Sequence, residues 1–491
     1  MPTSKSEPRD GAGEVHDLAV IGAGPAGLAA ADAAARLGLR VALVDAGSRL
    51  GGQYYRHPGP ELGAAHPEKL HHGWAVFARL RERLAASPLV EHLAGHHVWA
   101  VEAGVPGDGE RPWHLHATRG PGAADRATVL ARAVLLATGA HERHLPFPGW
   151  TLPGVVTAGG AQAMLKSSLV LPGHRIVVSG SGPLLLAAAS SLVSAGAEVP
   201  AIVEATSYLG YVRGLPVLAG NPAKLAEGAA HGARLLRHGV RLRRSSAVVE
   251  AHGTDRITAV TVARLDARWK PVPGSERRIA CDALAIGHGL VPQIELAAEL
   301  GAETVTGPDG AVALKVDAEQ RTSVPGLWAA GETCGVGGAD LALAEGVLAA
   351  HAVAGRPAPA RETAVRRRRR AFAALMAAAH VPGPDWTGWV TDDTEVCRCE
   401  EVPAREVRAA VEELGAGDAR TVKLLTRAGM GWCQGRMCGP AVACLSGGGA
   451  GRPDSRPLSC PVPLAQLAEP RPERSGLEPG PEPGPERSGR Y

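Results

Sequence analysis

Four cysteines in the C-terminal part of the chain have the spacing of metal ligands. Cys397 and Cys399 form a C-x-C pair, and Cys433 and Cys438 follow as a C-x-x-x-x-C pair. Zinc cysteines usually come as C-x-x-C pairs, so this pattern is unusual for zinc. Glycines around the second pair can free backbone N–H groups to bond cluster sulfurs. We expect a [2Fe–2S] cluster here, with structural zinc as the alternative and disulfides as the least favoured use.

A glycine-rich loop near the N-terminus has the chemistry of a dinucleotide site. Gly22, Gly24 and Gly27 follow the apolar run 18–21 with the G-x-G-x-x-G spacing, and an Ala-rich helical pattern continues after them. The helix start offers unpaired N–H groups and the positive end of its dipole to phosphates. Asp45 ends the next apolar run, where an acid meets a ribose hydroxyl. The sequence therefore predicts a strand–turn–helix unit that binds a dinucleotide.

Three later segments are expected beside the same cofactor. The Gly-rich bend at Gly52-Gln53 is placed to pass close to it, although a purely structural turn is an equally good interpretation. Thr138-Gly139 ends an apolar strand that must cross close to it. Gly331-Glu332 ends another apolar run, just before a helix at 340–350, which suits a ribityl hydroxyl and a flavin ring over the helix dipole. No paired cysteines lie near the first helix, which argues against disulfide reduction. The expected ligand is FAD.

A second strand–glycine–helix unit follows at Gly180–Leu185, with Leu185 in the third glycine position. Its second strand ends in Glu204, an acid that would repel a 2′-phosphate, so NAD fits better than NADP if a nicotinamide dinucleotide binds. A retained fold with a lost or altered ligand is an equally good interpretation.

These units predict an α/β protein with two dinucleotide-binding, Rossmann-like domains, the second inserted in the first, plus a small C-terminal helical domain with the cysteines. The 491 residues suffice for this organisation. The expected segments are the FAD-binding domain (16–150 and 288–355), the inserted domain (151–287), a linker and helix (356–390), the cysteine domain (391–446) and a disordered tail (466–491).

Composition excludes several other classes. The net charge of +3 is too near balance to imply nucleic acid, and no apolar run is long enough for a membrane span. Without a signal-peptide pattern, a cytoplasmic protein is the default. The run Arg366–Arg370 lies on a predicted helix and is interpreted as a solvated helix face.

The order of these motifs resembles a known family. The glycine loop, the segment 137–143, the Pro-rich segment 146–160, the run 180–186 and the module 397–439 follow one another as in the FAD-containing, iron–sulfur-binding alpha-type subunits of hydrogen cyanide synthase, opine oxidase and dye-linked proline or hydroxyproline dehydrogenases. The chain is also similar to the middle of the sarcosine oxidase alpha subunit, and its cysteine module resembles bacterioferritin-associated ferredoxin (BFD), with a longer final cysteine gap.

The resemblance implies cofactors and a partner. It implies FAD on the first glycine loop, Asp45 and Gly139, a cluster on the four cysteines, and a D-amino-acid-oxidase-like FAD subunit that oxidises the C–N bond of an amino acid or amine. One departure is Glu332, because such flavoproteins commonly have Asp there.

Three functions remain open from the sequence. The preferred one is an oxidoreductase subunit that passes electrons from the oxidation of an amino acid, opine or secondary amine, through FAD and the cluster, to an acceptor. The second is a self-sufficient NAD(P)H-dependent flavoprotein reductase with its nicotinamide at Gly180–Leu185. The third is a non-enzymatic redox-sensing or scaffold protein. No side chain is singled out as a general acid or base, because the cofactors would carry the redox chemistry.

Overall fold

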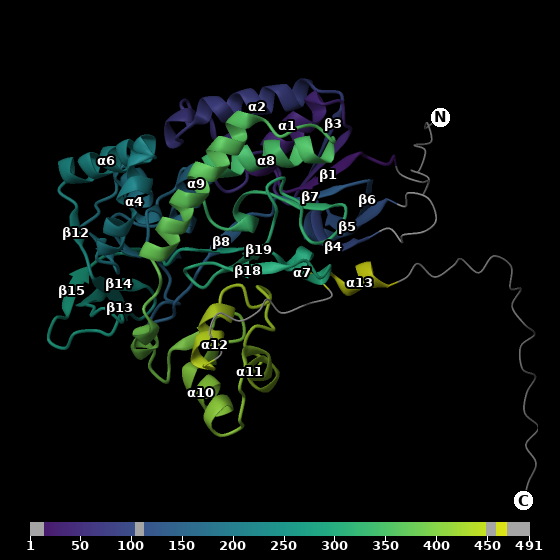
Figure 1. Cartoon of the computed structure of the whole chain (residues 1–491). Helices are drawn as coiled ribbons and strands as arrows, with labels where there is room; N and C mark the ends of the chain where they lie inside the picture. Colours follow the sequence, from purple (N-terminus) through teal and green to yellow (C-terminus); the bar gives the residue numbers. More distant parts are fainter. Residues whose placement is uncertain (1–13, 104–111, 448–457, 469–491) are drawn as a thin grey trace, which may run out of the picture.

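The computed structural model describes residues 14–103, 112–447 and 458–468. Its first domain is built on a five-stranded parallel sheet (Figure 1). In spatial order its strands are β20 (Leu327–Ala329), β7 (Val134–Leu136), β1 (Leu18–Ile21), β2 (Val41–Asp45) and β3 (Val90–Ala94). The three central strands, β7, β1 and β2, are apolar and almost fully buried, as expected for a parallel sheet covered on both faces, whereas the edge strand β3 is partly exposed.

Strand β20 is contributed by a part of the chain about 190 residues after β7, and it brings a helix with it. Helix α8 (Ala339–Val353) packs along α1 (Pro25–Arg36), the helix that follows the first glycine loop. The approach is close: a Cβ at Gly346 of α8 would lie 2.1 Å from the carbonyl oxygen of Ala26. The small residues of both helices therefore allow α8 to lie directly over the start of α1.

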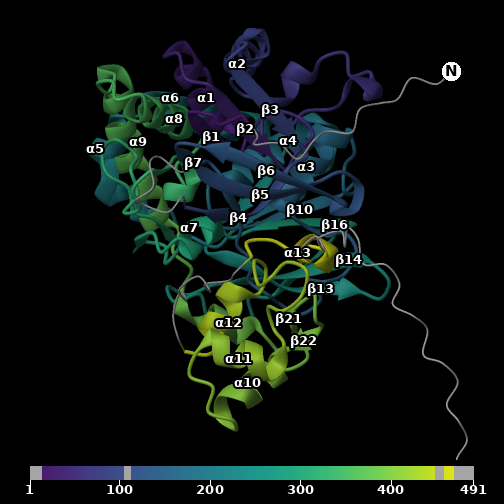
Figure 2. The ribbon, with the colours of Figure 1, turned by 90° about the vertical axis from the view of Figure 1, so that its right-hand side faces the viewer.

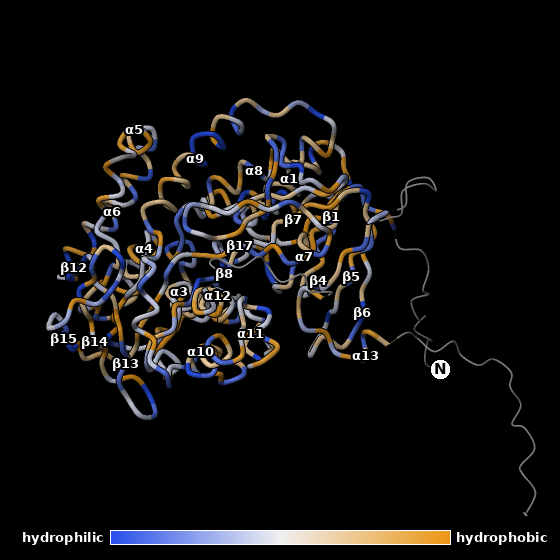
Figure 3. Tube along the Cα trace, turned by 60° about the horizontal axis from the view of Figure 1, so that its bottom comes forward, coloured by the Kyte–Doolittle hydropathy of each residue, from blue (hydrophilic) through white to orange (hydrophobic). Residues whose placement is uncertain are grey.

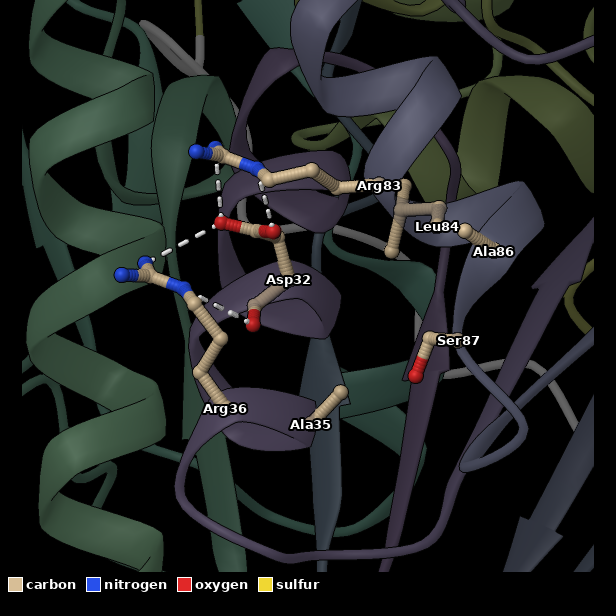
Figure 4. Close-up of a pocket in the computed structure, with 7 residues that line it drawn as sticks. All are labelled: Asp32, Ala35, Arg36, Arg83, Leu84, Ala86 and Ser87. Carbon is tan, nitrogen blue, oxygen red and sulfur yellow. Dashed lines mark hydrogen bonds and ion pairs between the residues drawn. The ribbon is translucent and has the colours of Figure 1, made fainter.

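A buried carboxylate fastens α1 to α2 (Trp74–Ala86). The side chain of Asp32 is 5% exposed, and Arg36 and Arg83 contact it at 3.0 and 2.9 Å. The three side chains border a hollow of about 270 Å³ between the helices (Figure 4). Because both arginines pair with the Asp32 carboxylate, we interpret the residues around this hollow as structural contacts between α1 and α2.

The second domain repeats this plan with a parallel sheet of β12 (Arg241–Arg243), β11 (Ala201–Glu204), β10 (Ile176–Gly180), β16 (Ala283–Gly287) and β9 (Val155–Thr157). Its helices are α3 (Ala158–Ser168), α4 (Leu184–Ser194), α5 (Leu215–Ala219) and α6 (Pro222–Arg237). Each domain adds an antiparallel sheet. These are β4 (His97–Glu102), β5 (Trp113–Arg119) and β6 (Asp125–Ala131), and β13 (Ser246–Gly253), β14 (Ile257–Arg264) and β15 (Arg277–Ala280).

Since the second sheet is formed entirely between β7 and β20 of the first, the second domain is an insertion. The short antiparallel pair of β8 (Ala140–Glu142) and β17 (Leu290–Pro292) flanks the insertion, and a second pair, β18 (Thr304–Thr306) with β19 (Val312–Leu314), follows it. Helix α7 (Glu295–Glu299) lies between these pairs in sequence.

The cysteine domain is small and lies at the lower end of the molecule in Figures 1 and 2. It contains β21 (Glu395–Cys397), β22 (Val402–Pro403), α10 (Ala404–Glu412), α11 (Ala419–Thr426) and α12 (Gly439–Leu445). Its core is shared with the rest of the chain, because Val407 and Cys438 belong to the same buried cluster as Leu145 and Trp269. The expected fold class, two Rossmann-like domains and a helical cysteine domain, is confirmed.

Helix α9 (Ala360–Ala379) crosses from α8 to the second domain (Figure 1) and carries the arginine run. The interpretation of this run as a solvated face is wrong for three of its five members. Arg366 and Arg370 contact the fully buried Glu345 of α8, and Arg369 contacts Asp340 at 2.8 Å. Carboxylates on a neighbouring helix explain the inward side of the run.

Among the described residues, no helix is long and apolar enough to cross a membrane, and Figure 3 shows polar residues interspersed along the longer helices. Of the expected disordered tail, residues 466–468 are described and include the end of α13 (Leu464–Leu467); residues 469–491 lie outside the described part.

Candidate functional site

The first glycine loop leaves room for an anion at the start of α1. A Cβ at Gly22, which has a φ of +107°, would lie 2.3 Å from the carbonyl oxygen of Ala137, so only glycine fits the turn. A Cβ at Gly27 would lie 1.8 Å from the carbonyl oxygen of Gly22. At Gly24, by contrast, no atom of the described residues lies within 4 Å of where a Cβ would be. The loop is tight toward the protein and open toward a ligand.

The helix terminus matches this opening. Gly24 is the N-cap residue of α1, and within the described part of the chain no side chain caps it and no acid lies in its first turn. The terminal N–H groups and the helix dipole thus face the open side of the loop. This combination fits the pyrophosphate of a dinucleotide.

Asp45 and the bend after it border the same loop. The Asp45 carboxylate accepts hydrogen bonds from the backbone N–H groups of Ala23 and Gly47. A Cβ at Gly52 would lie 2.7 Å from Cα of Gly24, so the bend lies directly against the loop. Gln53 is exposed and accepts a hydrogen bond from Arg56, and no contact of its side chain with the loop is seen in the described residues.

Thr138 and Gly139 lie at the carboxyl end of β7, beside the returning segment. The Thr138 hydroxyl donates to the carbonyl of Gln293 at 2.7 Å, and the Gly139 N–H donates to the hydroxyl of Thr333 at 3.0 Å. Two segments that are far apart in sequence therefore meet at the carboxyl edge of the sheet. In open α/β sheets this edge is where ligands bind.

Gly331 and Glu332 are held by α8. The Gly331 N–H donates to Glu345 at 3.0 Å. Burial raises the pKa of Glu332, and a hydrogen bond from the N–H of Gly338, the N-cap residue of α8, opposes this rise. The Glu332 carboxyl thus sits at the start of α8, where the longer side chain finds a backbone partner.

Together these residues fit FAD. The loop, the acid at the end of β2 and the edge formed by Thr138, Gly139 and Gly331 come from segments 16–150 and 288–355, as expected for a single cofactor. Whether each side chain contacts the cofactor remains a prediction.

The four cysteines come together from two loops. Cys397 ends β21, Cys399 follows in the turn to β22, and the other two precede α12. Cys397 and Cys438 hydrogen-bond each other, as do Cys399 and Cys433. A Cβ at Gly431 would lie 2.3 Å from Cβ of Cys399, so this glycine lets the two loops approach.

The environment of these thiols favours a metal cluster over inert cysteines. The hydrogen bond from Cys438 is the largest cause lowering the pKa of Cys397 to about 5, and backbone N–H groups including that of Gly429 contribute. Among the described residues, no group of three or more ligand-type side chains is gathered closely enough to hold a single metal ion. The thiols form two pairs instead, and two pairs are the donor number of a two-iron cluster.

The four cysteines differ in their exposure to solvent. Cys397 and Cys438 are buried, Cys433 is half-buried and Cys399 is exposed. The buried pair faces the shared core with Leu145, and the exposed one faces solvent. Of the glycines expected to supply N–H groups to sulfur, only Gly429 does so in the described residues, at 3.5 Å from Sγ of Cys397.

The second glycine loop is covered by the chain itself. Glu204 is 1% exposed and accepts hydrogen bonds from the Gly182 N–H at 3.2 Å and the Thr206 hydroxyl at 2.9 Å. His380, at the end of α9, bonds the Ser181 hydroxyl at 3.0 Å and the hydroxyl of Tyr211.

The two loops differ in what covers them. Asp45 of the first loop is half-buried, whereas Glu204 has Tyr208 at 3.4 Å and His380 at 3.7 Å. Leu185 is buried in the domain core. A nicotinamide dinucleotide would have to displace these side chains.

Several residues of the site carry no signal that is visible in the sequence alone. Thr333 accepts a hydrogen bond from Gly139, and Glu345 accepts hydrogen bonds from Gly331 and Arg370. In the sequence, Thr333, Glu345 and Arg370 are ordinary helix or loop residues, because their partners lie far away in the chain. His141 and Arg143 stand within the run 137–143, and the resemblance of that run to the family was the one available signal for them.

Two family models match this chain, one over the two Rossmann-like domains and one over the cysteine domain. The model of the pyridine nucleotide-disulphide oxidoreductase family matches residues 16–355, and that of the BFD-like [2Fe-2S] binding domain matches residues 395–445. The second range includes all four cysteines. The expected cofactors, FAD and a [2Fe–2S] cluster, are confirmed, and zinc is not supported.

Curated relatives are similar over most of the chain. The HcnB subunit of hydrogen cyanide synthase from Pseudomonas aeruginosa is 35% identical over 85% of this chain and 90% of that protein. An opine oxidase subunit from Agrobacterium tumefaciens is 33% identical over 87% of this chain and 85% of its own. The sarcosine oxidase alpha subunit from Rhizobium meliloti is 30% identical over 86% of this chain but only 38% of its own.

A solved structure supports the fold. L-proline dehydrogenase from P. horikoshii aligns with a TM-score of 0.66 over 93% of this chain and 80% of that chain, at 20% identity. The similarity shows that the two chains share an architecture.

Proposed function

Because the chain belongs to the pyridine nucleotide-disulphide oxidoreductase family and carries a BFD-like [2Fe-2S] binding domain, we propose that it is the electron-transfer subunit of an amine or amino-acid dehydrogenase. It is an FAD-dependent oxidoreductase, and similar proteins are named as subunits of larger enzymes. The proposed donor is the C–N bond of an amino acid, an opine or a secondary amine, oxidised in a D-amino-acid-oxidase-like partner subunit.

The observation that carries this proposal is the contact between the two cofactor regions. The chain segment that follows Thr138 and Gly139 runs to the cysteine domain, where the indole N–H of Trp150 donates to the carbonyl of Glu395 at 2.6 Å. Leu145 lies in one buried cluster with Cys397. The chain segment that leaves the expected FAD site therefore packs directly against the domain that carries the cysteines.

The cofactors divide the chemistry between them. Oxidation of a C–N bond to an imine releases two electrons and two protons; flavin accepts electrons in pairs, and a [2Fe–2S] cluster passes them singly. This chain would hold FAD through its glycine loop, which would bind the pyrophosphate, and would hold the cluster through its four cysteines, which would ligate the iron.

The covered second loop weighs against a self-sufficient NAD(P)H reductase. Glu204 and the N–H of Gly182 bond each other, and His380 lies over them. A pure scaffold or redox sensor gains no support from the intact features at both cofactor sites. It differs from the proposal in having no substrate.

The test uses the purified chain and the chain co-expressed with a D-amino-acid-oxidase-like partner from the same source. Under anaerobic conditions NADH and NADPH should leave the flavin spectrum of the chain alone unchanged, while dithionite bleaches it. The complex should reduce a dye with one substrate from a panel of glycine, proline, sarcosine and opines. Rapid bleaching by NADH would overturn the proposal in favour of the reductase. If none of these amines lets the complex reduce the dye, the scaffold interpretation is favoured.

A further inference from the structure

His141 links strand β8, which follows Thr138 and Gly139 of the expected FAD site, to the loop that carries Cys433 and Cys438. It is the middle residue of β8, two positions after Gly139, and it is paired with Val291 of β17. The backbone of this region is fixed from the flavin side: Gly139 bonds Thr333, and Gln293 donates from its N–H to the carbonyl of Gly139. The starting point of the His141 side chain is therefore set by the residues that border the flavin.

The ring reaches the loop of Cys433 and Cys438. A hydrogen bond joins it to the backbone carbonyl of Arg436, which stands between these two cysteines. The Arg436 side chain is also held: its guanidinium contacts Glu295 of α7 at 2.9 Å and donates to the carbonyl of Ser459 at 2.7 Å. Glu295 follows Gln293 by two residues, so both anchors of the loop come from the flavin side.

The protonation state of His141 suits this role. Burial lowers its pKa to about 4, and the nearby charge of Arg436 adds to the effect. The ring is therefore neutral at pH 7 and carries one N–H. Because Nδ1 has no partner among the described residues, we assign the N–H to Nε2, which donates to the Arg436 carbonyl.

The other cysteine loop is held by the same segment nine residues later. Trp150 bonds Glu395, two residues before Cys397. The stretch from Gly139 to Trp150 thus touches both loops, with His141 at one and Trp150 at the other. His141 contacts the loop that carries two of the four thiols.

We propose that His141 is a positioning residue for electron transfer. Its hydrogen bond to the Arg436 carbonyl fixes the Cys433–Cys438 loop against strand β8, which follows Thr138 and Gly139. This proposal rests on the proposed function only in taking flavin and cluster as consecutive electron carriers. It makes no statement about substrate or partner. Loss of the bond lets the loop move away and slows the passage of electrons between the two groups.

The test compares three variants of the purified holoprotein. His141→Ala removes the bond, His141→Gln keeps an N–H donor for the carbonyl, and His174→Ala changes an exposed histidine of the second domain as a control. Iron and FAD are counted, amide exchange is followed at residues 433–438, and the cluster's EPR signal and midpoint potential are recorded. The flavin is then photoreduced, and the rate at which the cluster becomes reduced is measured.

For His141→Ala we expect full FAD, near-full iron, faster amide exchange at residues 433–438 and cluster reduction slower by about tenfold or more. His141→Gln should recover most of the rate, and His174→Ala should match the parent. The proposal is overturned if His141→Ala changes neither exchange nor rate. It is also overturned if His141→Ala and His141→Gln lose both cofactors alike, since that outcome assigns a purely structural role.

Failure of this inference is distinguishable from failure of the proposed function. Photoreduction needs no partner and no amine, so the rate comparison is valid even if no substrate is found. Conversely, a complex that oxidises an amine would keep the proposed function intact even if His141→Ala transfers electrons at the parent rate.

Discussion

The Nε–H of Arg370 donates to the carboxylate of Glu345 at 2.8 Å, from α9 to α8. The carboxylate is fully buried, and its second oxygen accepts the N–H of Gly331 at 3.0 Å. Arg370 also donates to the carbonyl of Cys334 at 2.7 Å. A single arginine of the basic run thereby fixes the segment 331–334, directly at Cys334 and through Glu345 at Gly331.

Arg370→Ala should weaken both folding and FAD retention. Among the described residues it leaves the buried Glu345 carboxylate with the Gly331 N–H at 3.0 Å and Arg366 at 3.7 Å. Loss of the closest charged partner of a buried carboxylate costs on the order of 3 kcal/mol. Arg367→Ala, an exposed member of the same run, is the matched control and should change stability by about 0.5 kcal/mol or less. Thermal unfolding and the FAD-to-protein ratio measure the two effects. Equal behaviour of the two variants would contradict the assigned contact.

The arginine run shows where prediction from sequence stops. Helical periodicity indicates that Arg366, Arg369 and Arg370 share a side of α9, but it says nothing about what that side faces. The acids that decide the matter, Asp340 and Glu345, lie on another helix more than 20 residues earlier. A basic run is solvated or paired according to partners that only the tertiary structure supplies.

The glycine loops show the opposite case and its limit. At Gly22, Gly24 and Gly27 the spacing itself encodes the turn, so the loop and the cofactor class could be predicted locally. The second loop has the same local signal, but His380 comes from about 200 residues later to cover it. Whether a loop is open depends on long-range packing, which the spacing of glycines does not record.

Cys433→Ser should remove the cluster and leave FAD in place. The serine hydroxyl is a poor ligand for iron, and the substitution breaks the thiol pair with Cys399. Cys444→Ser changes an exposed cysteine of α12 in the same domain and serves as the control. Iron per chain and the visible spectrum report on the cluster, and released FAD reports on the flavin. If iron and spectrum stay at the parent level in Cys433→Ser, this cysteine is not a ligand.

Asp32→Asn should destabilise the first domain without touching either cofactor site directly. The substitution leaves Arg36 and Arg83 without their shared carboxylate, and charged hydrogen bonds of this kind are worth about 1.5–3 kcal/mol. Glu303→Gln, which breaks an ion pair to Lys315 that is more than half exposed, is the control and should cost less than about 1 kcal/mol. Chemical denaturation followed by flavin fluorescence gives both values. A smaller loss for Asp32→Asn than for the control would show that the buried pair is not what joins α1 to α2.

His288 predicts an acid-labile junction between the domains. It is fully buried, and burial, with Arg143 and His144 nearby, lowers its pKa to about 3. Both ring nitrogens are without partners among the described residues, and the ring lies 5.9 Å from Trp269 and 6.2 Å from Trp389, centroid to centroid. The folded protein therefore holds this ring neutral and among aromatic neighbours.

The sign of the pH effect follows from the two pKa values. Between about pH 6.5 and pH 3 the unfolded chain binds a proton at His288 and the folded chain does not, so stability falls as the pH falls, by about 1.4 kcal/mol per pH unit. His288→Phe keeps an aromatic ring and removes the titration. Its unfolding free energy should therefore decline less steeply from pH 6.5 to pH 5 than that of the parent. His238→Asn, at an exposed position after α6, should keep the parent slope. Parallel parent and His288→Phe curves would mean that His288 is already protonated, or partnered, in the folded protein.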